Sequence, residues 1–126
     1  MNSKDNKEMT KFFMKLLTFF VVAIGLCSTA NANEFRACAK YQRADYSWSH
    51  GYKITGFVVK GDDLNEIANT FKYSVYRNYF VIPWKKGGYT ALELNSYEDE
   101  PPIIEREYRD QRQRNWKLKN GWDWCN

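Results

Sequence analysis

Residues that bind metals or carry redox chemistry are scarce in this chain of 126 residues. It has one histidine, His50, and three cysteines, and none of these is a close neighbour of another. Zinc sites are built from clustered His and Cys ligands, and dithiol redox enzymes from closely spaced cysteines. Ser47 and Ser49, beside His50, match no known nucleophile context. We therefore expect no metal site, no cofactor and no enzyme activity.

A large excess of one charge is also missing. The chain has 19 Lys and Arg and 15 Asp and Glu, but four lysines and two acids lie in its first 32 residues, which leaves a net charge of +2 for residues 33–126. Proteins that bind nucleic acids usually have a strongly basic surface. We therefore expect no nucleic acid as a partner.

Long hydrophobic runs are confined to the first 32 residues. Leu16–Cys27 is interrupted only by Thr18 and Gly25 and is shorter than the ~20 apolar residues of a membrane span. Lysines precede this run, and Ala30-Asn31-Ala32 follows it with the small residues of a cleavage site. We expect residues 1–32 to be a cleavable signal peptide of the bacterial type rather than an uncleaved anchor. Residues 33–126 are then one mature domain, periplasmic or secreted, without stable membrane insertion.

Removal of the leader leaves two cysteines, Cys38 and Cys125, one near each end of the mature chain. In an oxidising compartment each has only the other as an intramolecular partner. We expect a disulfide between them that joins the terminal strands and adds about 4 kcal/mol of stability through chain entropy.

Short runs of strand-forming residues, separated by turn residues, indicate a mainly β domain. Tyr52–Lys60 alternates most clearly, with Ile54 and Val58 on one face, and Gly56 suggests a bend. The other expected strands are Glu34–Arg43, Phe71–Tyr76, Tyr79–Trp84, Tyr89–Leu94, Arg114–Lys119 and Trp122–Asn126. Phe71–Tyr76 and Tyr79–Trp84 are either separated at Arg77-Asn78 or fused into one bent strand.

One short helix is expected after Gly61. Asp63 and Glu66 have the spacing of a capping box, and Leu64, Ile67 and Ala68 share one face. Ile103–Tyr108 fits either an edge strand or a short helix. The pattern as a whole predicts a small antiparallel barrel or sandwich of about six to eight strands, of which the barrel leaves fewer exposed edges.

Aromatic residues next to lysines suggest a recognition surface. If Asn120-Gly121 forms a two-residue turn, Trp116, Leu118 and Cys125 share one face of the closing hairpin. The disulfide would make this face the interior, and the opposite face would then carry Lys117, Lys119, Trp122 and Trp124. Tyr46, Trp48, Tyr76 and Trp84 could extend this surface. The alternative is that lysine stems simply cover the rings.

Residues 84–92 (WKKGGYTAL) resemble the Trp-x-Lys-Gly…Leu stretch of the small exported inhibitors of c-type lysozyme. That family consists of disulfide-linked β-barrels of similar size, so the resemblance implies a barrel with inhibitory activity. The family's Ser-Gly…Tyr segment, which enters the lysozyme cleft, should lie upstream. Tyr73-Ser74-Val75-Tyr76 stands in that place and has no glycine.

These features favour an exported, non-enzymatic binding protein that acts on another protein of the envelope or medium, as an inhibitor or immunity-type antagonist of an envelope-attacking protein. A saccharide-binding or peptidoglycan-binding module is the alternative, with Trp48, Trp122 or Trp124 stacking on sugar rings. A small hydrolase that uses Glu98, Asp99 and Glu100 is the third hypothesis.

The leader generates the first prediction. Exported protein should begin at Asn33, because Ala30-Asn31-Ala32 fits the cleavage pattern better than any later position. Intact-mass measurement of the periplasmic or secreted fraction checks this. A membrane-bound species that retains Met1 would show that the leader is an anchor.

Overall fold

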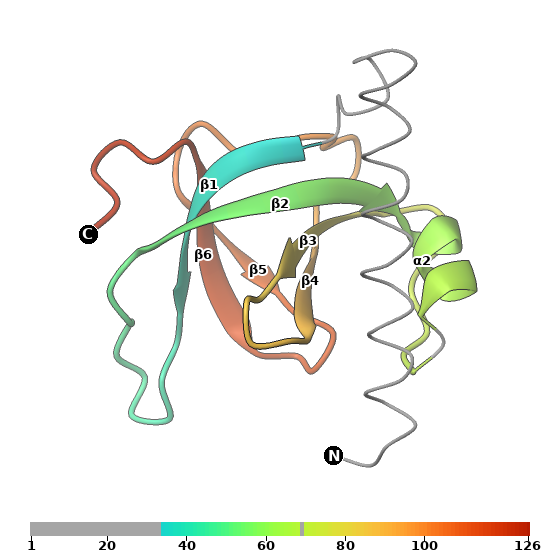
Figure 1. The fold of residues 1–126 in the computed structure, drawn as a ribbon, viewed down its shortest axis with the longest axis horizontal. Coiled ribbons are helices and arrows are strands. Elements are labelled where there is room, and N and C mark those ends of the chain that lie inside the picture. The colour runs from blue at the N-terminus through green and yellow to red at the C-terminus, as the bar shows by residue number, and fades with distance from the viewer. Residues whose placement is uncertain (1–33, 69) are drawn as a thin grey trace.

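The computed structural model describes residues 34–68 and 70–126, so the expected signal peptide lies outside the described residues. Six antiparallel strands form a nearly closed barrel, with one short helix beside it (Figure 1). The hydrogen-bonded order is β4-β3-β2-β1-β6-β5. The elements are β1 (Glu34–Tyr41), β2 (Tyr52–Lys60), α2 (Gly61–Ile67), β3 (Asn78–Pro83), β4 (Tyr89–Glu93), β5 (Arg106–Arg109) and β6 (Asn115–Asn120).

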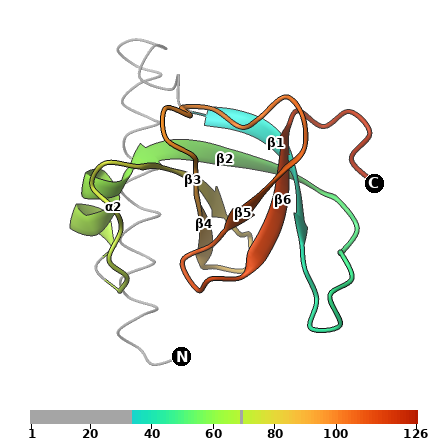
Figure 2. The same cartoon turned by 180° about the vertical axis from the view of Figure 1, so that it is seen from behind.

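The topology gathers three tight turns at one end of the barrel. Each turn joins an odd-numbered strand to the next strand, β1 to β2, β3 to β4 and β5 to β6, and all three pairs are antiparallel. The helix and the long β4–β5 connection lie toward the opposite end, and the C-terminal tail begins there, as Figures 1 and 2 show. We call the end with the turns the hairpin end and define it as residues 41–52, 83–90 and 109–116.

Alternate residues of the strands fill the barrel interior. Ala37 and Ala39 of β1 and Ile54 and Val58 of β2 belong to one buried cluster, and the alternation predicted for β2 is therefore confirmed. The other buried members of this cluster are Phe80, Ile82, Leu92, Leu94, Tyr108, Trp116 and Leu118. Position 56 has room only for glycine, because a Cβ there would lie 2.5 Å from the Phe80 ring.

A second buried cluster lies outside the barrel, where α2 and the segment after it cover β3 and β4. Leu64 and Ala68 pack there with Val81 and Ala91. The helix was predicted, but its capping box was wrong: the helix begins at Gly61, and Lys60 precedes it without a side-chain cap. Gly61 is required at this position because a Cβ would lie 1.7 Å from the Ser74 carbonyl oxygen.

The strand predicted at Phe71–Tyr76 was wrong. Residues 71–76 form no strand. The backbone of Tyr73 bonds to a side chain instead of a neighbouring strand, because the Asn65 amide donates to the Tyr73 carbonyl (2.8 Å) and accepts from the Tyr73 N–H (2.7 Å). Ile103–Tyr108 was predicted as either an edge strand or a short helix. Its last three residues belong to the edge strand β5.

The predicted closing hairpin was also wrong. β6 ends at Asn120, Gly121 turns the chain with a φ of 84°, and Trp122–Asn126 forms no strand. The Gly121 N–H donates to the Arg36 carbonyl (2.8 Å), which directs the tail across β1 instead of back along β6.

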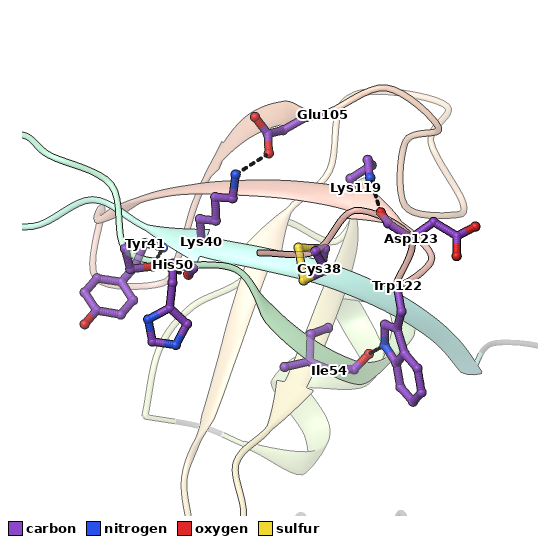
Figure 3. Close-up of a disulfide and its surroundings, with 11 residues drawn as sticks. Cys38, Lys40, Tyr41, His50, Ile54, Glu105, Lys119, Trp122 and Asp123 are labelled. Carbon is purple, nitrogen blue, oxygen red and sulfur yellow. Dashed lines mark hydrogen bonds and ion pairs between the residues drawn. A yellow bond between two sulfur atoms is a disulfide. The ribbon is translucent and has the colours of Figure 1, made fainter.

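The Cys38–Cys125 disulfide is confirmed, with a Cα–Cα distance of 5.5 Å. It lies on the outer face of the barrel (Figure 3), because Cys38 alternates with the interior residues Ala37 and Ala39. Trp116 and Leu118 do face the interior as predicted, but the inference that Cys125 shares their face was wrong. Pairing of β6 with β1, which sets Leu118 opposite Ala39, determines the facing instead.

Two observations bear on location. A disulfide between the terminal regions is typical of a non-cytoplasmic, oxidising environment. In the described ranges, no helix has the length and apolarity needed to cross a membrane.

Burial generates the second prediction. Trp116 is 6% exposed and Trp124 is 88% exposed, so Trp116→Ala should lower the free energy of unfolding by about 3–5 kcal/mol. Trp124→Ala should change it by about 0.5 kcal/mol or less. Denaturant unfolding of both variants measures this contrast, and similar losses would contradict the facing of β6.

Candidate functional site

The outer face of β1 and β6 brings together several residues of the predicted recognition surface. Lys117 lies over the Trp48 ring, 4.5 Å from its centroid. Glu105 pairs with both Lys40 (3.5 Å) and Lys117 (3.9 Å). The positive charge of Lys40 and Lys117 is therefore partly neutralised by Glu105 on the same face.

Trp122 and Lys119 lie farther along this face, near the disulfide (Figure 3). The Trp122 indole N–H donates to the Ile54 carbonyl (2.9 Å), and the Arg36 guanidinium lies 4.6 Å from the ring centroid. Lys119 donates to the Asp123 carbonyl. Internal cations thus stack on the rings of Trp48 and Trp122, whereas Trp124 is exposed.

Two predicted residues lie elsewhere. Tyr76 is exposed in the connection between α2 and β3. Trp84 is half-buried at the hairpin end, where its indole N–H donates to the Thr90 hydroxyl (2.8 Å). The structure joins neither of them to the surface around Lys117.

Trp84 belongs to an aromatic cluster at the hairpin end. Its ring stacks on Trp116 at 6.0 Å and meets Tyr52 edge-on at 6.4 Å. Tyr41 contacts both Tyr52 (6.0 Å) and Trp116 (5.8 Å). His50 lies 4.2 Å from Tyr52. Tyr41, His50 and Tyr52 belong to the β1–β2 hairpin, Trp84 to the β3–β4 hairpin and Trp116 to the β5–β6 hairpin. The ring contacts therefore join the three hairpins.

All three turns of the hairpin end have the same backbone geometry. Each turn spans five residues, 43–47, 84–88 and 110–114. The N–H of the first residue donates to the carbonyl of the fifth, and the N–H of the fourth donates to the carbonyl of the first. The fourth residue has a positive φ. This is a type I turn followed by a left-handed residue, a position that favours glycine. Gly87 occupies it in the β3–β4 turn, but Tyr46 and Gln113 occupy it in the other two.

Tyr46 is therefore the unusual residue of the β1–β2 hairpin. Its φ is 68°, and its side chain is 80% exposed. Among the described residues, its ring has no aromatic or cationic partner. The hairpin that carries Tyr46 projects away from the barrel in Figures 1 and 2.

Polar contacts hold the projecting hairpin in one shape. Asp45 accepts hydrogen bonds from the Ser47 hydroxyl (2.6 Å) and N–H (3.0 Å), and these bonds lower the pKa of Asp45. Arg43 donates to the Ser47 hydroxyl and to the Trp48 carbonyl. The tip is thus ordered before it meets any partner.

The β5–β6 turn is organised by a buried carboxylate. Asp110 is fully buried and accepts hydrogen bonds from the Arg112 N–H (2.8 Å), the Arg114 N–H (2.9 Å) and the Trp116 indole N–H (2.9 Å). The Arg114 Nε adds an ion pair at 2.8 Å.

Side chains also join the three hairpins to one another. The Gln111 amide accepts from the Ala91 N–H (2.8 Å) and donates to the Tyr89 carbonyl (3.0 Å), which closes the gap between β5 and β4. The Asn115 amide donates to the Gln42 side chain (2.9 Å). The hairpin end is consequently one rigid unit.

Of the predicted acid cluster Glu98, Asp99 and Glu100, Glu98 has structural partners. Glu98 accepts from the Asn95 N–H and the Tyr108 hydroxyl, both at 2.8 Å. Burial and this contact with Glu98 raise the pKa of Tyr108. In the part of the chain that the structure describes, no group of His, Cys, Asp and Glu is arranged to hold a metal.

Sequence reasoning did not identify Asp110 and Gln111. Both stand in the polar run from Arg109 to Arg114, which reads as a solvated loop. The one available signal was the equal length of three turn segments, Arg43–Ser47, Trp84–Gly88 and Asp110–Arg114, of which a single one contains glycine.

Comparisons with protein-family models, with curated proteins and with solved structures found no match for this chain.

Turn geometry generates the third prediction. Tyr46→Gly should change the free energy of unfolding by less than about 1 kcal/mol, because release of the left-handed tyrosine offsets the entropy that glycine loses. Tyr97→Gly is the matched control, since Tyr97 is also fully exposed with a φ of 73° but belongs to the β4–β5 connection. Thermal or denaturant unfolding measures both, and a loss above about 2 kcal/mol for Tyr46→Gly would mean that its ring supports the fold.

Proposed function

We propose that this protein is an exported, non-enzymatic binding protein, an inhibitor or immunity-type antagonist of an envelope-attacking protein, that contacts its target through the β1–β2 hairpin. The observation that carries the proposal is Tyr46, an exposed aromatic residue at a left-handed position on a projecting, internally bonded hairpin.

The conformation of Tyr46 supports a role in binding. A residue with a Cβ is less stable than glycine in the left-handed region by about 1 kcal/mol, and this ring makes no compensating aromatic or cationic contact within the described residues. Strained residues of this kind gather at functional sites. Tyrosine is also among the residues that contribute most to protein interfaces.

The rigidity of the hairpin supports the same proposal. Binding by a flexible loop loses conformational entropy, and a loop already held in its bound shape avoids most of that loss. The bonds of Asp45 and Arg43 to Ser47 and Trp48 provide this order. The disulfide suits a protein that acts outside the cytoplasm.

The two alternatives have weaker support. Sugar stacking requires free aromatic faces, but Lys117 and Arg36 already lie over the rings of Trp48 and Trp122, which leaves the exposed Trp124 alone as a platform. Hydrolysis by the acid cluster would need two carboxylates held at a cleft, but both oxygens of Glu98 are engaged in hydrogen bonds and Asp99 and Glu100 are exposed on the β4–β5 connection.

An inhibition assay tests the proposal and constitutes the fourth prediction. The exported, disulfide-bonded protein is titrated into turbidity assays with c-type and g-type lysozymes and a peptidoglycan amidase. We expect saturable inhibition of at least one enzyme at or below about 1 μM. Tyr46→Gly should weaken it by about tenfold or more, because an interface anchor is removed.

Tyr97→Gly is the control and should leave the inhibition constant within about twofold. Absence of inhibition of every enzyme at about 100 μM would count against the antagonist function. Equal losses for Tyr46→Gly and Tyr97→Gly would count against the β1–β2 hairpin as the contact.

A further inference from the structure

We infer that the hairpin end docks as a whole on an acidic protein surface, with the free cations of the β3–β4 and β5–β6 hairpins facing carboxylates of the partner. This inference rests on the proposed function and adds the chemistry of the target. It follows from the distribution of charge in the fold, which the small net charge of the chain conceals.

The charges of the described residues are segregated along the barrel. The hairpin end, residues 41–52, 83–90 and 109–116, has two acids and six cations and so a net charge of +4. The rest of the described chain has nine cations and eleven acids and so a net charge of −2. The six cations are Arg43, Lys85, Lys86, Arg109, Arg112 and Arg114.

Both acids of the hairpin end are used inside it. Asp110 is completely buried beneath the β5–β6 turn and holds Arg114 and the Trp116 indole. Asp45 accepts two hydrogen bonds from Ser47 within the β1–β2 turn. Neither carboxylate forms a salt bridge with Lys85, Lys86 or Arg112.

Most cations at this end are free to meet a partner. Lys85, Lys86, Arg109 and Arg112 are exposed, and none of them forms a salt bridge with another described residue. The outer face of β1 and β6 differs, because Glu105 there already pairs with Lys40 and Lys117. Unpaired charge is therefore concentrated at the hairpin end.

The fixed spacing of these cations favours a folded partner over a flexible polyanion. Gln111 and Asn115 join the three hairpins, and the exposed Tyr46 belongs to the turn of one of them. A rigid set of cations with one exposed aromatic ring matches a surface on which carboxylates border an apolar depression. A flexible polyanion can follow any local concentration of cations, so its binding reports where the charge is and does not require a fixed spacing.

Charge reversal with NMR mapping tests the inference. Isotope-labelled exported protein is titrated with poly-L-glutamate, a carboxylate probe, and separately with heparin, a sulfated one, at about 0.1 M salt. The test variant is Lys85→Glu with Arg112→Glu. The control is Lys60→Glu with Lys72→Glu, two exposed lysines outside the hairpin end. Both double variants have the same net charge, so the comparison isolates position.

We expect poly-L-glutamate to shift amide signals of residues 43–47, 84–88 and 110–114. The test variant should bind at least about tenfold more weakly, and the control within about twofold of the native protein. Equal losses in the two variants, shifts centred on Lys40 and Lys117, or no binding would overturn the inference. Heparin binding about tenfold tighter than poly-L-glutamate at the hairpin end would also overturn it, in favour of an anionic glycan.

Failure of this inference can be distinguished from failure of the antagonist function. If a lytic enzyme is inhibited in a Tyr46-dependent way but the test variant inhibits it as strongly as native protein, the antagonist function holds and the acidic surface is wrong. If poly-L-glutamate binds the hairpin end but no lytic enzyme is inhibited, the acidic surface holds and the antagonist function is wrong.

Discussion

The buried carboxylate of Asp110 is the interaction on which the hairpin end depends. An ionised group can be buried only when hydrogen bonds and an opposite charge replace the water it loses. Three N–H donors and the Arg114 guanidinium do so here, and together they fix the shape of the β5–β6 turn. This shape directs the Gln111 amide to the edge of β4 and the Trp116 ring into the aromatic cluster. The turn that bridges β5 to β4 and carries Trp116 is therefore held in shape by one satisfied charge.

The two ends of the barrel have different tasks. Away from the hairpin end, α2 covers the outer side of β3 and β4. On the outer face, the disulfide fixes the tail to β1 and lies against Gly51 at the base of the β1–β2 hairpin. At the hairpin end, side-chain amides, aromatic rings and Asp110 provide the order instead. Because these contacts are made by side chains beneath the turns, the turn tips remain exposed and are available for binding.

Three exposed aromatic residues, Tyr46, Tyr97 and Trp124, share a left-handed backbone within the described chain. Folding alone would favour glycine at each position. They lie in three different segments, the β1–β2 turn, the β4–β5 connection and the tail. Of these three, only Tyr46 belongs to the hairpin end, which also carries the unpaired cations, and this position distinguishes it as the candidate anchor.

Local patterns in the sequence were sufficient for several features. The alternation of Tyr52–Lys60, the glycine turn after Trp84 and the two mature cysteines predicted β2, the β3–β4 hairpin and the disulfide, because each depends on neighbouring residues or on a single possible pairing. Other features depended on long-range partners. Asn120-Gly121 has the local signal of a hairpin, yet a hydrogen bond from Gly121 to Arg36 of β1 turns the tail away from β6. Trp84 and Trp122 looked alike as aromatic neighbours of lysines, but contacts with Trp116 and Ile54 place them at opposite sides of the barrel wall. Asp110 stands among arginines as any solvated acid would, and only the packing of Trp116 above it makes it a buried charge, since burial is a property of the assembled fold.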